Sequence, residues 1–336
     1  MKKLKKIVLW FLLLVLLVVA GAAAAAWYWA HNPVALGADR VDYLVESGNR
    51  PRTIAQIMNR AGIKVNEDAF VIMARLSGRD VLIKAGAYEA AQGDTPWKLL
   101  ERMANGDMTQ TSLTLVEGWT YQRIRQFLRD DPNLKQTLDN VSDADLLKRL
   151  GATQTSPEGL FYPDTYVFVP GSNDFDILRR AYHAQEQQLA SIWAQRDPDT
   201  PLKTPYDALI LASIIEKETG HSADRQRVAG VFVNRLRLSM PLQTDPTVIY
   251  GMGEAYQGRI RKKDLTADTP WNTYTRGGLP PTPIANSGRA SLLAAVHPEA
   301  HQYLYFVSRG DGTSEFSKNL LEHNRAVAKY ILGQGR

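Results

Sequence analysis

Apolar and polar residues follow one another along this chain in patterns that predict many helices, few short strands and one membrane-length segment. Residues 7–26 form an apolar run without a charged side chain, which is long enough to cross a bilayer as a helix. Most later segments have apolar residues at helical spacing, whereas the runs with strand-like alternation are short. The pattern therefore predicts an α+β protein with an N-terminal transmembrane helix.

Residues 40–107 are predicted to form a small α+β module. Thr53 and Thr95 are expected as helix N-caps, and Gly106 is expected to end a helix. The order of strand, helix, helix, strand and helix is similar to that of a LysM-like glycan-binding unit, and a structural spacer domain fits the same pattern. The expected elements are strands at 41–45 and from 86–89 onward, and helices at 53–61, 69–76 and 96–104.

Residues 108–336 are predicted to form a larger, mixed α+β domain. Helical periodicity dominates it, and an Arg309–Gly312 turn between two alternating runs is typical of a hairpin. Prolines make the loop around 277–284 stiff, because they fix φ. The expected helices are 120–128, 143–150, 176–196, 206–220, 224–238, 287–296 and 320–332, and the expected strands are 111–116, 159–169 with its loop, 303–308 and 315–317.

The central stretch, Tyr206 to Gly220, carries two glutamates on a helix that we expect to end at Gly220. At about 100° per residue, Glu218 and Glu216 point in nearly opposite directions. An apolar face under a carboxyl keeps it protonated near neutral pH and able to donate a proton, whereas a plain helix-end carboxylate would stay near water. Glu218 lies over Leu211, Ile214 and Ile215, and Glu216 lies nearer Leu209, Ala212 and Ser213.

The flanks of the apolar run predict its orientation. Lysines precede it, which predicts that the N-terminus stays in the cytoplasm, and the aromatic residues of 27–29 suit the far interface. A cleaved signal peptide is the alternative, since Ala22–Ala26 offers small-residue cleavage sites, but the length of the run favours an uncleaved anchor. The predicted order is a cytoplasmic tail at 1–6, a transmembrane anchor at 7–29 and a linker at 30–39.

Composition narrows the function classes. The chain has 336 residues, of which 44% are hydrophobic, and this length suits two or more domains with an ample core. The net charge of +5 includes four lysines before residue 7, and no basic patch elsewhere suggests nucleic acid as a partner. The absence of cysteine excludes disulfides, thiolate metal sites and a lipid-modified N-terminal cysteine.

Histidine and arginine positions give weaker signals. His297 and His301 are four residues apart, but Pro298 interrupts any helix that would align them on a metal. No HExxH motif is present, and we predict no metal and no cofactor. Four arginines within the predicted helix 224–238 could meet a charged substrate, although a solvated helix face also explains them.

Several motifs, in one order, closely resemble the endolytic murein transglycosylase family of bacteria. The resemblance covers nearly the whole chain and is strongest over residues 158–325. In that family the second glutamate of the EKET motif is catalytic, and this position is Glu218 here. The motifs are EGLFYPDTYVF (158–168), LASIIEKET (211–219), LQTDPTVIYGMG (242–253), NTYT (272–275), GLPP (278–281) and YLYFVSRGDGTSEFSKNLLEHN (303–324).

The resemblance implies an activity and a location. It implies an uncleaved single-pass anchor in the inner membrane, a LysM-like module and a catalytic domain at 108–336 in the periplasm. It further implies cleavage of the β-1,4 bond between N-acetylmuramic acid and N-acetylglucosamine inside peptidoglycan strands, which leaves a 1,6-anhydromuramic end. The peptidoglycan synthases are the candidate protein partners. A non-catalytic glycan-binding scaffold and a hydrolytic muramidase remain as alternative functions.

Polar residues of the same motifs are expected around the cleft. Asp245 would supply the second carboxylate of a hydrolase, or it is a turn residue before Pro246. Asn324 is placed in the site by analogy with the motif. Phe161, Tyr162 and Tyr166 could stack on sugar rings or belong to the core. The expected substrate-binding residues are Gln243, Thr244, Asp245, Tyr250, Asn272, Thr273, Tyr274, Tyr162 and Asn324.

Overall fold

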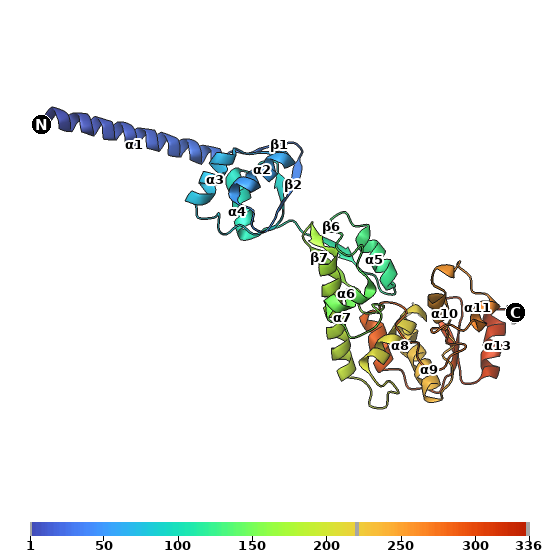
Figure 1. Cartoon of the computed structure of the whole chain (residues 1–336). Helices are drawn as coiled ribbons and strands as arrows, with labels where there is room; N and C mark the ends of the chain where they lie inside the picture. The colour runs from blue at the N-terminus through green and yellow to red at the C-terminus, as the bar shows by residue number, and fades with distance from the viewer. Residues whose placement is uncertain (1, 219–221, 334–336) are drawn as a thin grey trace. The chain divides into compact units, whose positions relative to one another are not determined.

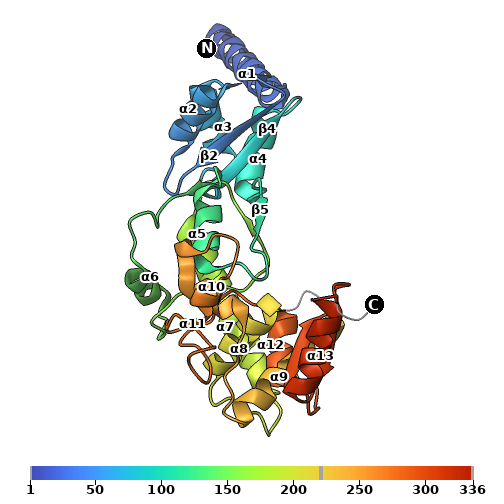
Figure 2. The ribbon, with the colours of Figure 1, turned by 90° about the vertical axis from the view of Figure 1, so that its right-hand side faces the viewer.

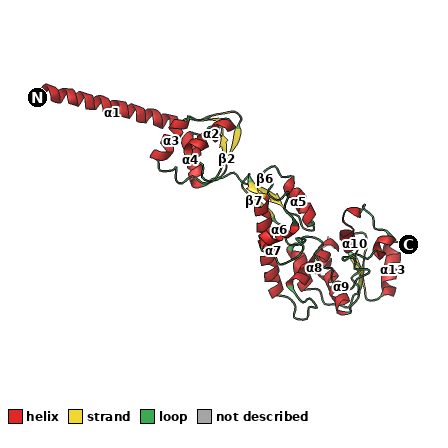
Figure 3. Ribbon diagram, in the orientation of Figure 1, coloured by secondary structure: helices red, strands yellow, loops and turns green. Residues whose placement is uncertain are grey.

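The computed structural model describes residues 2–218 and 222–333 (Figure 1). The chain forms two compact units, one made of residues 1–112 with 167–172 and the other of residues 113–166 with 173–336. Helices make up most of the regular secondary structure of both units, and strands occur only as short pairs in the described residues (Figure 3). The predicted α+β class is therefore confirmed.

The first unit begins with the long helix α1 (Lys2–His31). Its stretch Leu9–His31 is long and apolar enough to cross a membrane, judged by length and composition. The stretch predicted as a linker, 30–39, is built into the unit instead: Ala30 and Val34 are buried, and β1 (Ala35–Leu36) pairs with β3 (Ile63–Lys64). The backbone N–H of Val34 also donates a hydrogen bond to the carbonyl of Asp94, at 2.8 Å. These contacts hold the segment on the unit.

The rest of the first unit follows the predicted order. Strand β2 (Arg40–Val45) pairs in antiparallel fashion with β4 (Gly86–Ala91), and the helices α2 (Pro51–Ala61), α3 (Glu67–Leu76) and α4 (Pro96–Asn105) pack on this hairpin. The Thr95 side chain caps α4 by accepting the N–H of Lys98, as predicted. The prediction for Thr53 was wrong, because Pro51 begins α2 and Arg50 is its N-cap residue.

Helices dominate the second unit. Periodicity located most of them within a few residues, as for α6 and α9, and the hairpin of β9 and β10 is antiparallel as predicted. Two further strand pairs join β5 with β7 and β6 with β8. The bounds are β5 Thr111–Thr114, α5 Tyr121–Arg129, β6 Leu134–Lys135, α6 Asp143–Leu150, β7 Thr165–Phe168, β8 Ser172–Asn173, α7 Asp174–Ala194, α8 Pro205–Glu218, η1 Ser222–Asp224, α9 Arg225–Arg237, α10 Asp245–Met252, η2 Gly253–Ala255, α11 Lys262–Thr266, α12 Arg289–Val296, β9 Tyr305–Ser308, β10 Ser314–Ser317 and α13 Leu320–Tyr330.

Helix α8 lies at the centre of the second unit, in contact with α7, α9, α10 and α12 (Figure 2). The proline-rich loop is tied to it, since the hydroxyl of Ser213 accepts the N–H of Ile284 at 2.9 Å and donates to the carbonyl of Ile210 at 2.7 Å. The predicted helix end at Gly220 lies outside the described residues. Because neighbouring helices hold α8, they also hold the side chains of its last turn, Glu216 and Glu218.

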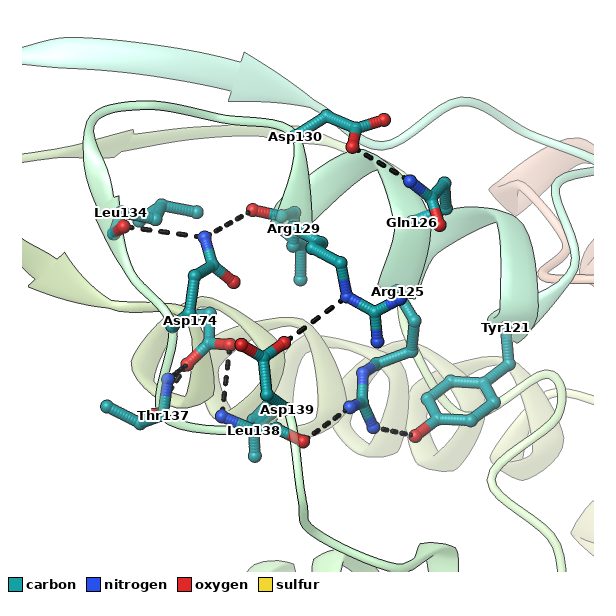
Figure 4. A network of polar contacts seen from close by, with 12 residues as sticks. Tyr121, Arg125, Gln126, Arg129, Asp130, Leu134, Thr137, Leu138, Asp139 and Asp174 are labelled. Carbon is teal, nitrogen blue, oxygen red and sulfur yellow. Dashed lines mark hydrogen bonds and ion pairs between the residues drawn. The ribbon is translucent and has the colours of Figure 1, made fainter.

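A polar network stabilises the part of this unit around α5 and the start of α7 (Figure 4). The buried carboxylate of Asp174 accepts hydrogen bonds from the backbone N–H groups of Thr137 and Leu138, at 2.9 and 3.2 Å. Arg125 donates to the carbonyl of Leu138 at 2.6 Å and to the hydroxyl of Tyr121 at 2.7 Å. These bonds fasten the 134–138 segment to the two helices.

Candidate active site

Local sequence starts α8 in a defined place. The Thr204 hydroxyl accepts the N–H of Asp207, and the Asp207 carboxylate accepts the N–H of Thr204, both at 3.1 Å. This reciprocal pair, with Pro205 in the first helical position, is a strong helix start. The helix then continues through residues 208–215, all of them buried, to Glu218.

The apolar environment of α8 differs from the predicted one-sided stripe. Leu209, Ala212 and Ser213 are as deeply buried as Leu211 and the isoleucines. Both glutamates consequently leave the helix where it emerges from the core, and each is half-buried. Glu216 accepts the backbone N–H of Gly288 at 3.0 Å, and it therefore has a structural partner.

A cluster of threonines holds Glu218. The Thr244 hydroxyl donates a hydrogen bond to Oε1 of Glu218. Thr244 is held in turn by Thr273, whose hydroxyl accepts the Thr244 N–H at 3.1 Å and lies 2.9 Å from the hydroxyl of Thr247. Gln243 adopts the left-handed backbone conformation (φ 48°), and its N–H donates to the carbonyl of Thr273 at 3.1 Å. The four residues form one hydrogen-bonded support for the glutamate.

Burial raises the pKa of the Glu218 carboxyl above its ordinary value, because desolvation disfavours the charged form. The negative charge of Asp245 raises this pKa further. The hydrogen bond from Thr244 and the positive charge of Arg235 act in the opposite direction without cancelling the effect of burial. Compared with an exposed glutamate, Glu218 is thus biased toward the protonated form, and the Thr244 hydroxyl is in place to stabilise its carboxylate after the proton leaves.

Glu218 opens onto a cleft of about 340 Å³. The Tyr274 hydroxyl donates to Oδ1 of Asp245 at 2.6 Å, so the two residues form a polar wall beside the glutamate. Side chains from α9, β9 and the start of α13 complete the cleft. Its polar lining consists of Glu218, Arg235, Gln243, Asp245, Tyr274 and His323.

Two members of this lining were not among the expected substrate-binding residues: His323 was not singled out, and Arg235 was one of four arginines for which substrate contact and a solvated face both stayed open. Arg235 is 7% exposed, which rules out a solvated helix face for it, and it donates to the carbonyls of Leu304 and Leu242, both at 2.7 Å. His323 stacks on Tyr305 at 5.2 Å between ring centroids. Its buried Nδ1 has no hydrogen-bond partner among the described residues, and burial lowers its pKa. His323 lies in the EHN sequence of the last motif, which was the available signal.

This arrangement supports acid catalysis by a single carboxyl. A neutral carboxylic acid in a cleft can protonate a leaving oxygen, and its conjugate base can then accept a proton from the substrate. Asp245 is exposed in the same cleft, at the first position of α10. Its place there is a helix start, whereas the sequence predicted a turn.

A protein-family model described as the YceG-like family matches residues 43–329, which is most of the chain. The chain belongs to the YceG-like family. It is 32% identical over 308 residues to the endolytic murein transglycosylase of Bacillus subtilis (strain 168), a match that covers 87% of this chain and 85% of that protein.

Two further matches are to proteins with the same names, an endolytic murein transglycosylase and a YceG-like protein. The endolytic murein transglycosylase of Streptococcus pneumoniae serotype 2 (strain D39) is 24% identical, over 85% of this chain and 58% of that protein. The crystal structure of a YceG-like protein from Listeria monocytogenes matches with a TM-score of 0.53 and 30% identity, over 85% of this chain and 98% of that one.

In this YceG-like chain, several residues expected at the cleft lie outside its lining. Asn272 is fully buried, and its amide bonds backbone groups, including the carbonyl of Ala267 at 2.7 Å and the N–H of Tyr274 at 2.9 Å. Tyr162 is half-buried outside the cleft lining, with its backbone N–H bonded to the carbonyl of Ala181 at 3.0 Å, and Asn324 is exposed on α13, also outside the lining. Phe161 and Tyr166 are buried, as the core alternative predicted.

Tyr250 lines a second cavity of about 450 Å³ together with Glu158. Glu158 is 4% exposed, and burial raises its pKa to about 7. Its Oε1 accepts the N–H groups of Tyr121 and Gly159, at 3.0 and 3.2 Å. The sequence signal for this residue was an acid directly before an aromatic-rich segment, and it was not recognised.

The histidine pair has structural partners in the YceG-like fold. His297 lies 2.6 Å from a carboxylate oxygen of Asp197, and His301 bonds the backbone of Arg227 and Tyr303 at 2.8 and 3.0 Å. Within residues 2–218 and 222–333, no group of three or more His, Asp or Glu side chains is arranged to hold a metal ion.

Proposed function

We propose that this protein is a membrane-anchored endolytic murein transglycosylase, with Glu218 as its catalytic acid and base. The observation that carries the proposal is the protonation-biased carboxyl of Glu218, held by Thr244 at the edge of a cleft. The names of the Bacillus and Streptococcus relatives support the reaction type and peptidoglycan as the substrate.

The reaction needs one carboxyl and no water. Glu218 donates its proton to the glycosidic oxygen that leaves C1 of N-acetylmuramic acid, and the C1–O bond breaks. The resulting carboxylate takes the proton from the C6 hydroxyl of the same sugar, whose oxygen then bonds to C1. The nucleophile is intramolecular and already positioned, which lowers the entropic barrier. The product is a 1,6-anhydromuramic end.

Neighbouring groups have defined tasks in this scheme. Thr244 orients the carboxyl and stabilises the carboxylate that exists between the two proton transfers. Asp245, Tyr274 and Gln243 offer hydrogen-bond partners for substrate hydroxyl and amide groups. The positive charge of Arg235 lies close enough to lower the pKa of Glu218, which limits how far burial raises it.

We place the catalytic unit outside the inner membrane, with α1 as a single-pass anchor and the N-terminus in the cytoplasm. The length and composition of Leu9–His31 support the anchor, and the preceding lysines support the orientation. The substrate is the glycan strand, and peptidoglycan synthases are the proposed protein partners. A LysM-like glycan-binding role is proposed for the module at 40–107.

Mass spectrometry of products from purified sacculi tests the proposal. The wild type should release anhydromuramic ends, and Glu218→Gln should release almost none. Glu216→Gln is the matched control on the same helix, because an amide oxygen can still accept the Gly288 N–H, and it should keep its activity. Normal yield from Glu218→Gln would reject the assignment.

One alternative function, hydrolysis, is favoured by Asp245, because this residue places a second carboxylate in the cleft. A hydrolytic muramidase would use it to activate water and would give reducing muramic ends that are heavier by one water. Reducing ends from the wild type, lost in Asp245→Asn, would establish that alternative. Anhydro ends from both the wild type and Asp245→Asn would exclude it.

A further inference from the structure

The first unit exposes large aliphatic side chains, of which Ile72 and Leu76 lie beside the end of α1. Leu76 and Val81 are 85% and 81% exposed, and Ile72 and Leu82 are more than half exposed. Isolated exposed leucines are common on soluble proteins, but a contiguous apolar surface marks a site of contact.

Helix α3 has a second apolar stripe beside its core side; Met73 of this stripe packs partly on the core, whereas Ile72 and Leu76 are exposed. Its core side is Phe70 and Ala74, both fully buried. A second set lies at spacing i, i+3, i+4 and i+7, which is one face of a helix. We call this set the α3 apolar face; it consists of Ala69, Ile72, Met73 and Leu76.

The α3 apolar face is continuous with the end of the apolar helix α1. Together they line a groove of about 450 Å³, to which α4 contributes Trp97. The His31 ring stacks on Trp27 at 4.6 Å and on Trp97 at 5.8 Å between centroids. Ala30 is 6% exposed. The last turn of α1 is therefore fixed to the unit, with no flexible linker between them.

The length of the apolar run in α1 places this groove at the membrane boundary. The 20 residues from Ile7 to Ala26 rise about 30 Å at 1.5 Å each, which equals the thickness of the hydrocarbon core. Trp27 then lies at the level of the headgroups, where tryptophan is enriched. Because Ile72 and Leu76 line the same groove as Trp27, they lie at that level too.

We propose that the α3 apolar face rests in the outer leaflet of the membrane that α1 crosses, at the boundary between headgroups and acyl chains. The occupant of the groove is thus phospholipid. Arg79 lies beside the groove, since its guanidinium is 4.4 Å above the Trp97 ring, and it forms an ion pair with Glu101 at 3.6 Å. This inference rests on the proposed membrane anchor, and it adds a second contact that sets how the first unit meets the bilayer.

The chain has no cysteine, so single labels can test the proposal on the full-length protein. Leu76→Cys, a mild change at an exposed position, carries the environment-sensitive fluorophore NBD. Ser47→Cys, in the exposed turn after β2, is the aqueous control, and Leu16→Cys, within the apolar span, is the membrane control. Each labelled protein is reconstituted into phosphatidylcholine and phosphatidylglycerol vesicles, and external iodide and brominated phosphatidylcholine serve as quenchers.

The label at position 76 should be quenched by brominated lipid and should be quenched by iodide roughly threefold less than the label at position 47, as for groups held at the acyl boundary. Iodide quenching equal to that at position 47, with position 16 still quenched by lipid, would overturn the proposal and leave the anchor intact. Failure of lipid quenching at position 16 would remove the anchor itself. If the label at position 76 is shielded from iodide but is not quenched by brominated lipid, and if this shielding is lost at one copy per vesicle, then the α3 apolar face contacts a second copy of the chain and not lipid.

Discussion

Thr244 donates its hydroxyl hydrogen to Glu218 and so joins the residue before α10 to the last turn of α8. The bond is strongest when the glutamate is charged, which in the proposed mechanism is the state between its two proton transfers. The N-cap residue of α10, Thr244, thus supports the carboxyl of Glu218 at the end of α8.

Replacing this donor should weaken catalysis without unfolding the protein. Thr244→Val keeps the shape but removes the hydroxyl, and a hydrogen bond to a charged group is worth about 1.5–3 kcal/mol. We expect the rate of anhydro-end formation to fall about 10- to 100-fold. Thr244→Ser should recover most of it. Equal rates for the valine and serine variants would show that the hydroxyl has no part in the reaction.

The pH dependence of the reaction should report the raised pKa of Glu218. The acid must begin protonated, so activity is lost as pH rises through this pKa, which burial moves above the ordinary value of 4.5. Thr244→Val removes an interaction that lowers the pKa, and it should therefore shift the alkaline limb to higher pH. A limb that moves to lower pH in this variant would contradict the assignment. The measurement is the rate against pH on soluble glycan fragments.

Glu158 should make the stability of the protein depend on pH. Its pKa is about 7 when folded, against 4.5 for the ordinary group, so between these values the folded state binds more protons than the unfolded one. The free energy of unfolding then decreases as pH rises from about 4.5 to 7, by at most about 3 kcal/mol for a shift of roughly 2.5 units.

Urea unfolding of the wild type and of Glu158→Gln, measured at pH 5 and pH 7.5, checks this expectation. The variant lacks the titrating group, so its stability should change less between the two pH values than that of the wild type. An identical pH dependence in both proteins would show that Glu158 is not the group responsible.

Arg235 should matter for folding as well as for the cleft. Arg235→Ala leaves the carbonyls of Leu304 and Leu242 without this partner, and each buried unpaired group costs about 1–3 kcal/mol. Thermal unfolding should show a clearly lower midpoint. Arg237→Ala is the control, since Arg237 is exposed on the same helix and bonds one carbonyl, that of Asp199. Equal losses in the two variants would contradict the role of buried bonding.

Local signals predicted the helices well, and tertiary contacts explain what they missed. The helix α4 begins and ends where Thr95 and Gly106 act as caps, because capping involves only neighbouring residues. Helix α10 was missed because Asp245-Pro246 is typical of a turn, whereas packing against α8 makes it a helix start.

The composition of the site was harder to predict than its centre. The family motif singled out Glu218, which lines the cleft, whereas the one-sided apolar stripe that also favoured it over Glu216 is absent, since both faces of α8 are buried. Tyr250 was expected beside Asp245, but five residues of helix turn it well away, and it lines the cavity of Glu158 instead. Substrate contact and a solvated face both stayed open for Arg235, because periodicity cannot tell whether a neighbouring segment covers a polar helix face. Here β9 and the residues before it do so.

The burial of α8 on every side has a consequence for how this protein tolerates change. A helix with one free face can absorb substitutions there, whereas this one has no such margin between residues 208 and 215. Packing errors far from the cleft would therefore shift Glu218, the proposed proton donor, before they unfold the domain. The same buried side chains of α8 thus determine both the stability of the domain and the position of Glu218. We therefore expect sequence variation within the family to concentrate in the loops.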